Sequence, residues 1–198
     1  MLRPATLLDA EPVRRWRNHP QVRAMSLTTH EIGPEEHAAW FARAVTDPDR
    51  RVLIYEHAGV PAGVVTFAGI RDGAASWGFY LDVDGLERRD ETLPAWMRVC
   101  REAVDYAFDD LGLDVLTGDV LAGNEAVRQL NRRLGFTETG SRTVTRDGVA
   151  GECLSIRLHR SERRARPPRT APPAAEANAE GAANAEGAAT ASGTGEGA

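Results

Sequence analysis

Three side chains in the first quarter of the sequence, Arg17, His37 and Trp40, are of types that could do chemistry. An arginine can bind a phosphate through two parallel N–H donors, and a tryptophan can stack on a nucleobase or a sugar face. A histidine takes up and releases protons near neutral pH, where its ordinary pKa lies. Each also has a structural explanation: a solvated charge at a helix end for Arg17, a partly buried histidine for His37, and a core side chain on an amphipathic helix for Trp40.

Composition and charge exclude several other classes of function. All 24 basic residues are arginines, so there is no lysine for a Schiff base or for a Walker-type phosphate loop. Cys100 and Cys153 have neither metal-ligand spacing nor a disulfide framework, and both lie in patterns typical of a core. A net charge of −5 argues against nucleic-acid binding. No signal peptide or membrane-length apolar run appears, which predicts a cytoplasmic protein without a membrane partner. Since the cysteines lack metal-ligand spacing, we also expect no metal.

The first half of the sequence predicts two helices and four strands. A strand over Leu2–Leu8 is followed by a helix that Asp9 caps and that runs to Asn18. A proline in the first turn and two glutamates mark a second helix. Short, turn-like joins then indicate an antiparallel meander. The second helix and the three strands of the meander are expected over Pro34–Val45, Arg51–His57, Ala62–Ile70 and Ala74–Asp82.

The second half predicts two helices among three strands. A loop over Val83–Thr92 leads to a long helix, which Gly112 ends. In the run Asp119–Phe136, Asn124 stands between a strand and a helix, where asparagine is a good N-cap. The helices and strands of this half are expected over Leu93–Leu111, Val115–Leu121, Glu125–Leu134, Thr137–Arg146 and Gly151–Leu158.

This order of elements predicts a mixed α/β sheet with helices on both faces. The foldable part covers residues 1–160, which is the usual size of one domain. From residue 161 to 198 the chain is rich in Ala, Gly, Glu and Pro and has almost no large apolar residue. Such a segment cannot form a core, so we expect a disordered tail.

The run Asp119–Phe136, a strand, a turn, a helix and a Gly-Phe re-entry into a strand, resembles the C-terminal half of the acyl-CoA site in the GNAT superfamily of N-acetyltransferases. The runs Arg17–Arg23, Glu35–Phe41 and Trp77–Leu81 resemble one branch of it. That branch includes the pseudaminic-acid pathway enzyme, which acetylates the 4-amino group of a UDP-linked 4-amino-4,6-dideoxy-hexose. The resemblance covers residues 1–158 and implies the α/β GNAT fold, with a mostly antiparallel mixed sheet.

The resemblance implies that acetyl-CoA is the acetyl donor. In the family, the strand that here includes Gly78–Val83 diverges from Val115–Leu121, and the pantetheine arm inserts between them by main-chain hydrogen bonds. Backbone groups of Phe79, Leu81 and Val83 are therefore expected to hold the cofactor. Asn124 matches a family position that hydrogen-bonds it, a role compatible with capping.

For the acceptor, the resemblance points to Arg17, His37, Trp40 and Tyr80 as the residues that bind a nucleotide-linked amino sugar. Transfer to an amine also needs a base, and His37 is our prediction; Glu31, Glu35 and Glu36 are the other candidates. The implied reaction is direct acetyl transfer in a ternary complex.

Two departures from the family bear on the mechanism. The loop before the long helix lacks the glycines whose amides usually reach the cofactor pyrophosphate, so Arg88 and Arg89 are expected to bind it by ion pairing. Asn131 replaces a tyrosine that is thought to protonate the thiolate. An asparagine amide does not titrate in the useful range, but it can hydrogen-bond the sulfur, with Tyr80 or a water as the proton source.

Two other functions remain open on the sequence. One is a protein N-terminal acetyltransferase of the ribosomal-protein type, with an open and acidic acceptor cleft. The other is a non-catalytic GNAT-fold binding module, which the missing glycines and the missing tyrosine favour. A homodimer is a further possibility.

Overall fold

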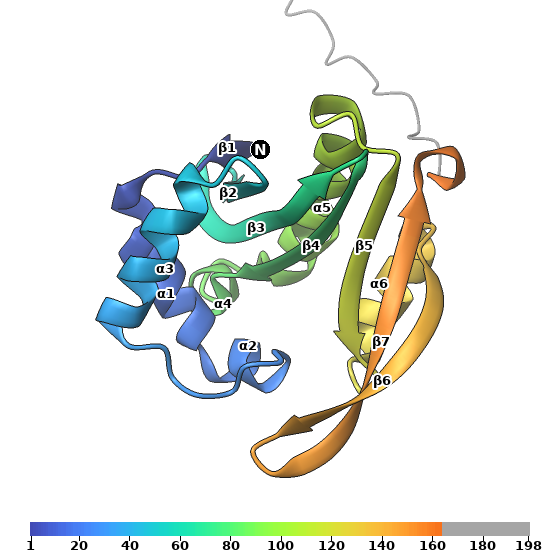
Figure 1. The fold of residues 1–198 in the computed structure, drawn as a ribbon. Coiled ribbons are helices and arrows are strands. Elements are labelled where there is room, and N and C mark those ends of the chain that lie inside the picture. The colour runs from blue at the N-terminus through green and yellow to red at the C-terminus, as the bar shows by residue number, and fades with distance from the viewer. Residues whose placement is uncertain (164–198) are drawn as a thin grey trace, which may run out of the picture. The chain divides into compact units, whose positions relative to one another are not determined.

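The computed structural model describes residues 1–163, so most of the predicted tail lies outside the described residues. These residues form one seven-stranded sheet in the order β1-β2-β3-β4-β5-β7-β6 (Figure 1). Every neighbouring pair is antiparallel except β4 and β5, which are parallel. The predicted mixed, mostly antiparallel sheet is confirmed. The strands are β1 (Leu2–Pro4), β2 (Arg50–His57), β3 (Val60–Arg71), β4 (Ala74–Leu81), β5 (Val115–Leu121), β6 (Thr137–Arg146) and β7 (Val149–His159).

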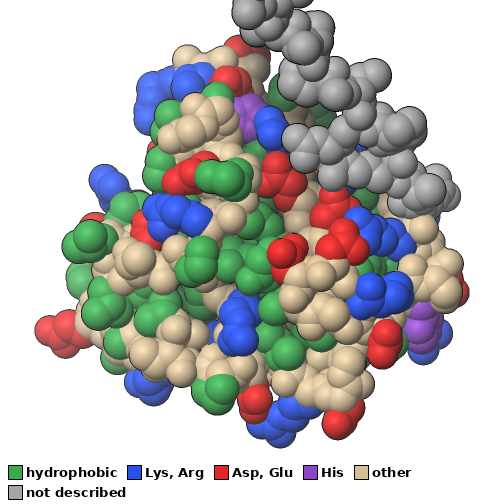
Figure 2. Space-filling model, turned by 90° about the horizontal axis from the view of Figure 1, so that it is seen from above, with side chains coloured by type: hydrophobic (Ala, Val, Ile, Leu, Met, Phe, Trp, Pro, Cys, Tyr) green, Lys and Arg blue, Asp and Glu red, His purple; other side chains and the backbone are tan. Residues whose placement is uncertain are grey.

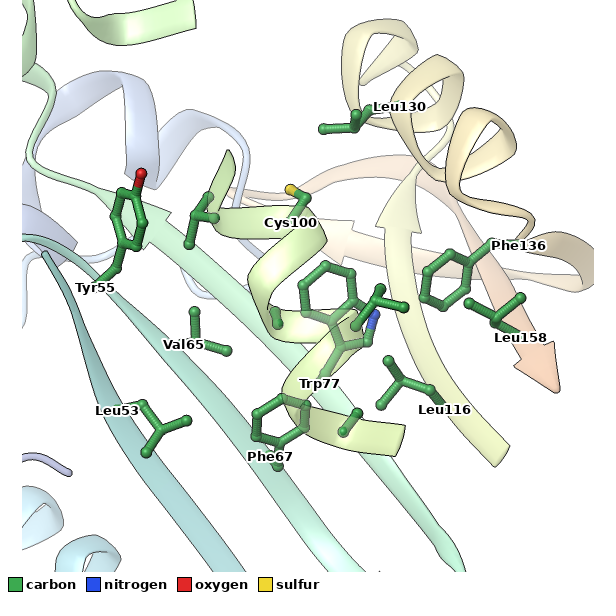
Figure 3. Close-up of a cluster of buried hydrophobic side chains, with 14 of the residues drawn as sticks. Leu53, Tyr55, Val65, Phe67, Trp77, Cys100, Leu116, Leu130, Phe136 and Leu158 are labelled. Atoms are coloured by element: carbon green, nitrogen blue, oxygen red, sulfur yellow. The ribbon is translucent and has the colours of Figure 1, made fainter. Parts of the chain in front are cut away.

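Helices cover both faces of the sheet, as expected. One buried cluster joins α5 and α6 to the sheet, and a smaller one joins α1 and α3 to residues of β2 and β3 on the other face. Figure 3 shows Trp77 and Phe136 of the larger cluster, whose rings stack with centroids 5.8 Å apart. The helices are α1 (Ala10–Asn18), α2 (Pro20–Ala24), α3 (Pro34–Thr46), α4 (Val83–Glu87), α5 (Thr92–Asp105) and α6 (Glu125–Leu134).

Three differences from the predicted elements have local causes. The first strand ends at Pro4, and a 3₁₀ turn over Leu7–Asp9 leads into α1. Pro20 disfavours helix at His19, so α1 ends at Asn18, and Pro20 itself occupies the first turn of a separate short helix, α2. The predicted loop after β4 begins with α4, because the Asp82 side chain accepts the Gly85 N–H at 3.1 Å and caps a helical turn. Both α2 and α4 border the candidate site.

The parallel pair creates the main opening in the sheet. β4 and β5 are paired only at Ala74–Ser76 with Val115–Thr117, after which the two strands separate. The divergence that the resemblance implied is therefore present in the structure. We call the space between the strands beyond this point the fork.

Candidate active site

A cavity of about 380 Å³ occupies the fork on the face that α5 and α6 cover. Its walls are mostly apolar and come from β4, β5, α4, the start of α5 and the α2 region up to Ser26, and its polar lining includes two asparagines of the α6 region. Trp77 lines its inner end, where a Cβ on Gly118 would approach the indole at 3.3 Å. A long apolar slot with a few polar groups is the usual form of a cofactor site.

The backbone of β4 presents unpaired groups to the fork. The Asp82 N–H donates to the Ala62 carbonyl at 2.9 Å, so the even-numbered residues of β4 point their main-chain groups toward β3. The main-chain groups of Phe79 and Leu81 therefore point toward β5, which no longer pairs with them. Phe79, Leu81 and Val83 all line the cavity. Their position suits the predicted main-chain contacts with a pantetheine arm.

Asn131 of α6 lies in this cavity with its amide unengaged. The residue is only 4% exposed, lines the cavity, and has no side-chain hydrogen bond to another described residue. An amide at a cavity wall that is not already engaged by the protein is available to a ligand in the fork. It can donate an N–H to an atom placed in the fork.

Asn124 also lines the cavity, and its side chain accepts the Val127 N–H at 3.3 Å, which makes it the N-cap of α6. Replacing Asn124 with Ala should lower the free energy of unfolding by about 1 kcal/mol, and Asn124→Ser should restore it. Thermal unfolding measures the cap, and acetyl-CoA titration measures the predicted cofactor contact. A serine variant that recovers stability but not affinity would show both roles. Full affinity in the alanine variant would leave Asn124 with the cap alone.

The loop before α5 folds on itself. Its amides at Arg88, Arg89, Asp90 and Glu91 donate to carbonyls of α4, and the Arg89 side chain pairs with Glu91 at 2.8 Å. Arg88 and Arg89 do not line the fork cavity, whereas Thr92 does. Since the Ala95 N–H bonds to Glu91 and Pro94 has none, the Thr92 and Leu93 amides are the helix-start donors left for an anion.

A second cavity, of about 310 Å³, adjoins the fork and takes its lining from α1 and from the loop after α2. Gly78, Phe79, Tyr80 and Leu121 line both cavities, so the fork connects them through the sheet. Arg17 and Thr66 line the second cavity only. A thioester in the first cavity and an amine in the second would therefore meet at the fork.

Arg17 brings an uncompensated positive charge to the second cavity. Its Nη2 donates to the Thr28 carbonyl at 2.9 Å, while Nη1 is shielded from solvent and has no partner. No described carboxylate forms an ion pair with it. Burial and the nearby Arg23 lower the pKa of Arg17, and burial raises the pKa of Tyr80 beside it. A desolvated cation without a counter-ion favours an anionic ligand.

Asp119 of β5, which the sequence reasoning did not single out, lines both cavities. Arg142 of β6 donates to its Oδ2 at 2.7 Å, and the Ser155 hydroxyl of β7 donates to its Oδ1 at 3.2 Å. The carboxylate is thus fixed at the fork and is still partly exposed. In the sequence, Asp119 could have been noticed only because it is a charged residue in an otherwise uncharged strand, five residues before Asn124.

The structure does not bring His37 and Trp40 to the cavities. His37 is 3% exposed and lies in α3 against Trp40 and Phe41, with ring centroids 5.4 and 5.6 Å away. Burial lowers the pKa of His37. Neither residue lines either of these two cavities, and neither do the predicted alternatives Glu31, Glu35 and Glu36. Of the four acceptor residues implied by the resemblance, Arg17 and Tyr80 come together.

Charged side chains of both signs are intermixed on the face shown in Figure 2, so this face presents no continuous basic surface. Within residues 1–163, no group of His, Cys, Asp and Glu side chains has the arrangement of a metal site. No helix in the same range is long and apolar enough to span a membrane.

Comparison with solved structures agrees with the fold. Spermidine N-acetyltransferase from Vibrio cholerae, solved with CoA and spermine, superposes with a TM-score of 0.71 at 18% identity over 82% of this chain and 96% of that one. Ribosomal-protein-alanine N-acetyltransferase from Brucella melitensis gives 0.66 at 19% identity, over 80% and 99%. YncA from Salmonella typhimurium, solved with its cofactor acetyl-CoA, gives 0.64 at 20% identity, over 85% and 98%.

No curated protein matches the sequence significantly. The model of the acetyltransferase (GNAT) domain matches residues 1–137, which is more than two thirds of the chain. With the forked sheet and its two connected cavities, this match shows that the chain is an acetyltransferase of the GNAT family.

Proposed function

We propose that the enzyme transfers the acetyl group of acetyl-CoA to the amino group of an anionic small molecule, by direct transfer in a ternary complex. A UDP-linked amino-deoxy sugar, as in pseudaminic-acid biosynthesis, is the candidate acceptor. The proposal rests on Arg17. Its half-buried guanidinium lies in the second cavity, which we call the acceptor cavity, and has no described carboxylate partner. A phosphate of the acceptor would supply the missing counter-charge.

The fork has the shape and the polar groups that the donor needs. Acetyl-CoA carries its acetyl group as a thioester at the end of a pantetheine arm. This arm fits an apolar slot lined by the unpaired edge of β4. We assign the main-chain groups of Phe79 and Leu81 to the arm, with Val83 next to them. For the pyrophosphate we assign the Thr92 and Leu93 amides, with Arg88 and Arg89 supplying charge from the preceding loop.

The reacting groups meet where the two cavities join. Asp119 is the base in this proposal: its carboxylate lines both cavities and can accept a proton from the acceptor ammonium. Asn131 donates an N–H toward the sulfur position and so stabilises the leaving thiolate. Tyr80 lines both cavities, and its hydroxyl, which is protonated at neutral pH like that of any tyrosine, can donate a proton to the thiolate.

The charge in the acceptor cavity distinguishes this proposal from the alternatives. Several structural neighbours are spermidine N-acetyltransferases, but a polyamine would bring further positive charge toward Arg17. A protein N-terminus would need a more acidic cleft, whereas Asp119 is already paired with Arg142.

The homodimer remains a prediction.

We expect acetyl-CoA to bind in calorimetry and thiol release to be fastest with a phosphate-bearing amine. The panel should contain a UDP-linked amino sugar, an uncharged amino sugar, spermidine and an N-terminal peptide. The change Arg17→Gln should raise KM for the phosphate-bearing amine about tenfold, without changing the Kd for acetyl-CoA. Arg15→Gln, an exposed arginine of the same helix, is the matched control.

Two results would contradict the proposal in different ways. No acetyl-CoA binding at millimolar concentration would favour the non-catalytic module. Preference for spermidine or for the peptide, with an unchanged KM in the Arg17 variant, would keep the enzyme but remove the anionic acceptor.

A further inference from the structure

The tip of the β6–β7 hairpin extends toward the side of the sheet that carries α2 (Figure 1), and two side-chain hydrogen bonds join it to the residues after α2 that line the acceptor cavity. Arg146 Nη2 donates to the Ala24 carbonyl at 2.5 Å, and the Thr29 hydroxyl donates to Asp147 Oδ1 at 2.6 Å. Between these two anchored residues lies Met25–Thr28, which we call the acceptor loop. All four of its residues line the acceptor cavity, and Met25 and Ser26 also border the fork cavity. The tip of the hairpin therefore holds both ends of the acceptor loop.

The other hydrogen bonds of the acceptor loop go to residues of α1 and α2, including a bond of 2.7 Å from the Ser26 hydroxyl to the Val22 carbonyl. Met25 and Leu27 are 55% and 45% exposed, so burial of apolar surface fixes the loop only weakly. Arg17 of α1 binds the Thr28 carbonyl, and Arg23 of α2 binds the Thr29 carbonyl. Ala24 is the last residue of α2, and its carbonyl is one of those that a helix end leaves without an intrahelical donor. A guanidinium is a favourable partner there.

The Arg146 side chain makes this hydrogen bond and forms no ion pair with a described residue. Its Nε is shielded from solvent and has no partner among the described residues. The same strand carries Arg142, which binds the Asp119 carboxylate at the fork. One strand thus contacts both the proposed base and the acceptor loop. The strand lies almost entirely beyond residue 137, where the family match stops.

We propose that Arg146 and Asp147 are positioning residues for the acceptor: they hold the acceptor loop over its cavity and so set affinity for the acceptor more strongly than affinity for acetyl-CoA, since Leu27 and Thr28 line the acceptor cavity alone. The role in catalysis rests on the proposed function, because it requires that the second cavity binds the amine. The contact that holds the loop is independent of the proposed function.

The test uses Arg146→Gln, which replaces the guanidinium with a shorter, uncharged side chain, and Thr29→Val, which removes the hydroxyl donor; both leave the Asp147 turn intact. Thr145→Ala, an exposed neighbour on β6, is the matched control. We expect hydrogen exchange at the Met25 and Ser26 amides, which bond to Val22 and Arg23 carbonyls, to become about tenfold faster in Arg146→Gln. KM for the amine that the wild-type enzyme acetylates fastest should rise about tenfold, and less in Thr29→Val. The Kd for acetyl-CoA should stay within about twofold of wild type.

Each outcome of these measurements tests a distinct part of the proposal. Unchanged exchange at Met25 and Ser26 in both variants would overturn the holding of the loop. Faster exchange with an unchanged acceptor KM would overturn its role in acceptor binding. An equal loss of acetyl-CoA affinity would point to general disruption of the fold and would also overturn the proposal. If the wild-type enzyme acetylates no amine, the proposed function fails, while the exchange measurement still decides whether the hairpin holds the loop.

Discussion

Asp119→Asn is expected to lower kcat by about 10²- to 10⁴-fold, the usual loss when a general base is removed. The substitution keeps the size of the side chain and one oxygen that can accept the Arg142 hydrogen bond, and its NH2 group can donate to the Ser155 hydroxyl, but it removes proton acceptance. Steady-state thiol release gives kcat, and calorimetry should show an unchanged Kd for acetyl-CoA. Because the amide preserves local contacts, the thermal midpoint should change little.

Asp110→Asn, an exposed carboxylate on the π-helical turn after α5, is the matched control and should leave kcat unchanged. A kcat within about twofold of wild type in Asp119→Asn would place the base elsewhere. His37 would then be the next residue to replace, since it was the base predicted from the sequence. Its position away from both cavities would require a relay through other groups.

The sheet and most helices could be predicted because local patterns determine them. Alternating apolar residues in β2 and β3 face two different buried clusters, Leu53 and Tyr55 on one side, Val52 and Ile54 on the other. The β4–β5 pairing joins residues about 40 positions apart, so no local pattern predicts it. Only the resemblance to the GNAT superfamily implied the fork.

The site was predictable only in part, for reasons of the same kind. Main-chain contacts from Phe79 and Leu81 depend on where the strand edge lies, which the fold determines. Trp40 and His37 lie on an amphipathic helix, where the same residue types serve equally well as packing. Asp119 was missed because one carboxylate on a strand is typical of a solvated face. Its importance arises from Arg142 and Ser155, which long-range pairing brings beside it.

Gly63→Ala is expected to have the largest effect on stability, because β3 and β4 leave no room for a methyl group. A Cβ at Gly63 would lie 2.6 Å from Leu81 Cδ2 and 2.7 Å from the Tyr80 carbonyl oxygen. The second of these atoms belongs to the backbone, so β4 itself must move. We expect a loss of about 1–3 kcal/mol in the free energy of unfolding and a fall of several degrees in the thermal midpoint.

The same displacement should reach the active site, since Tyr80 and Leu81 both line the fork. Affinity for acetyl-CoA should therefore fall together with stability in Gly63→Ala, whereas a purely structural cost would lower the thermal midpoint alone. Gly140→Ala is the matched control: it also lies in a strand, has no atom within 4 Å of the added Cβ, and should change the stability by less than about 0.5 kcal/mol. If both variants unfold at the wild-type temperature, β4 can shift without cost, and the fork is less rigid than its role in aligning a thioester with an amine requires.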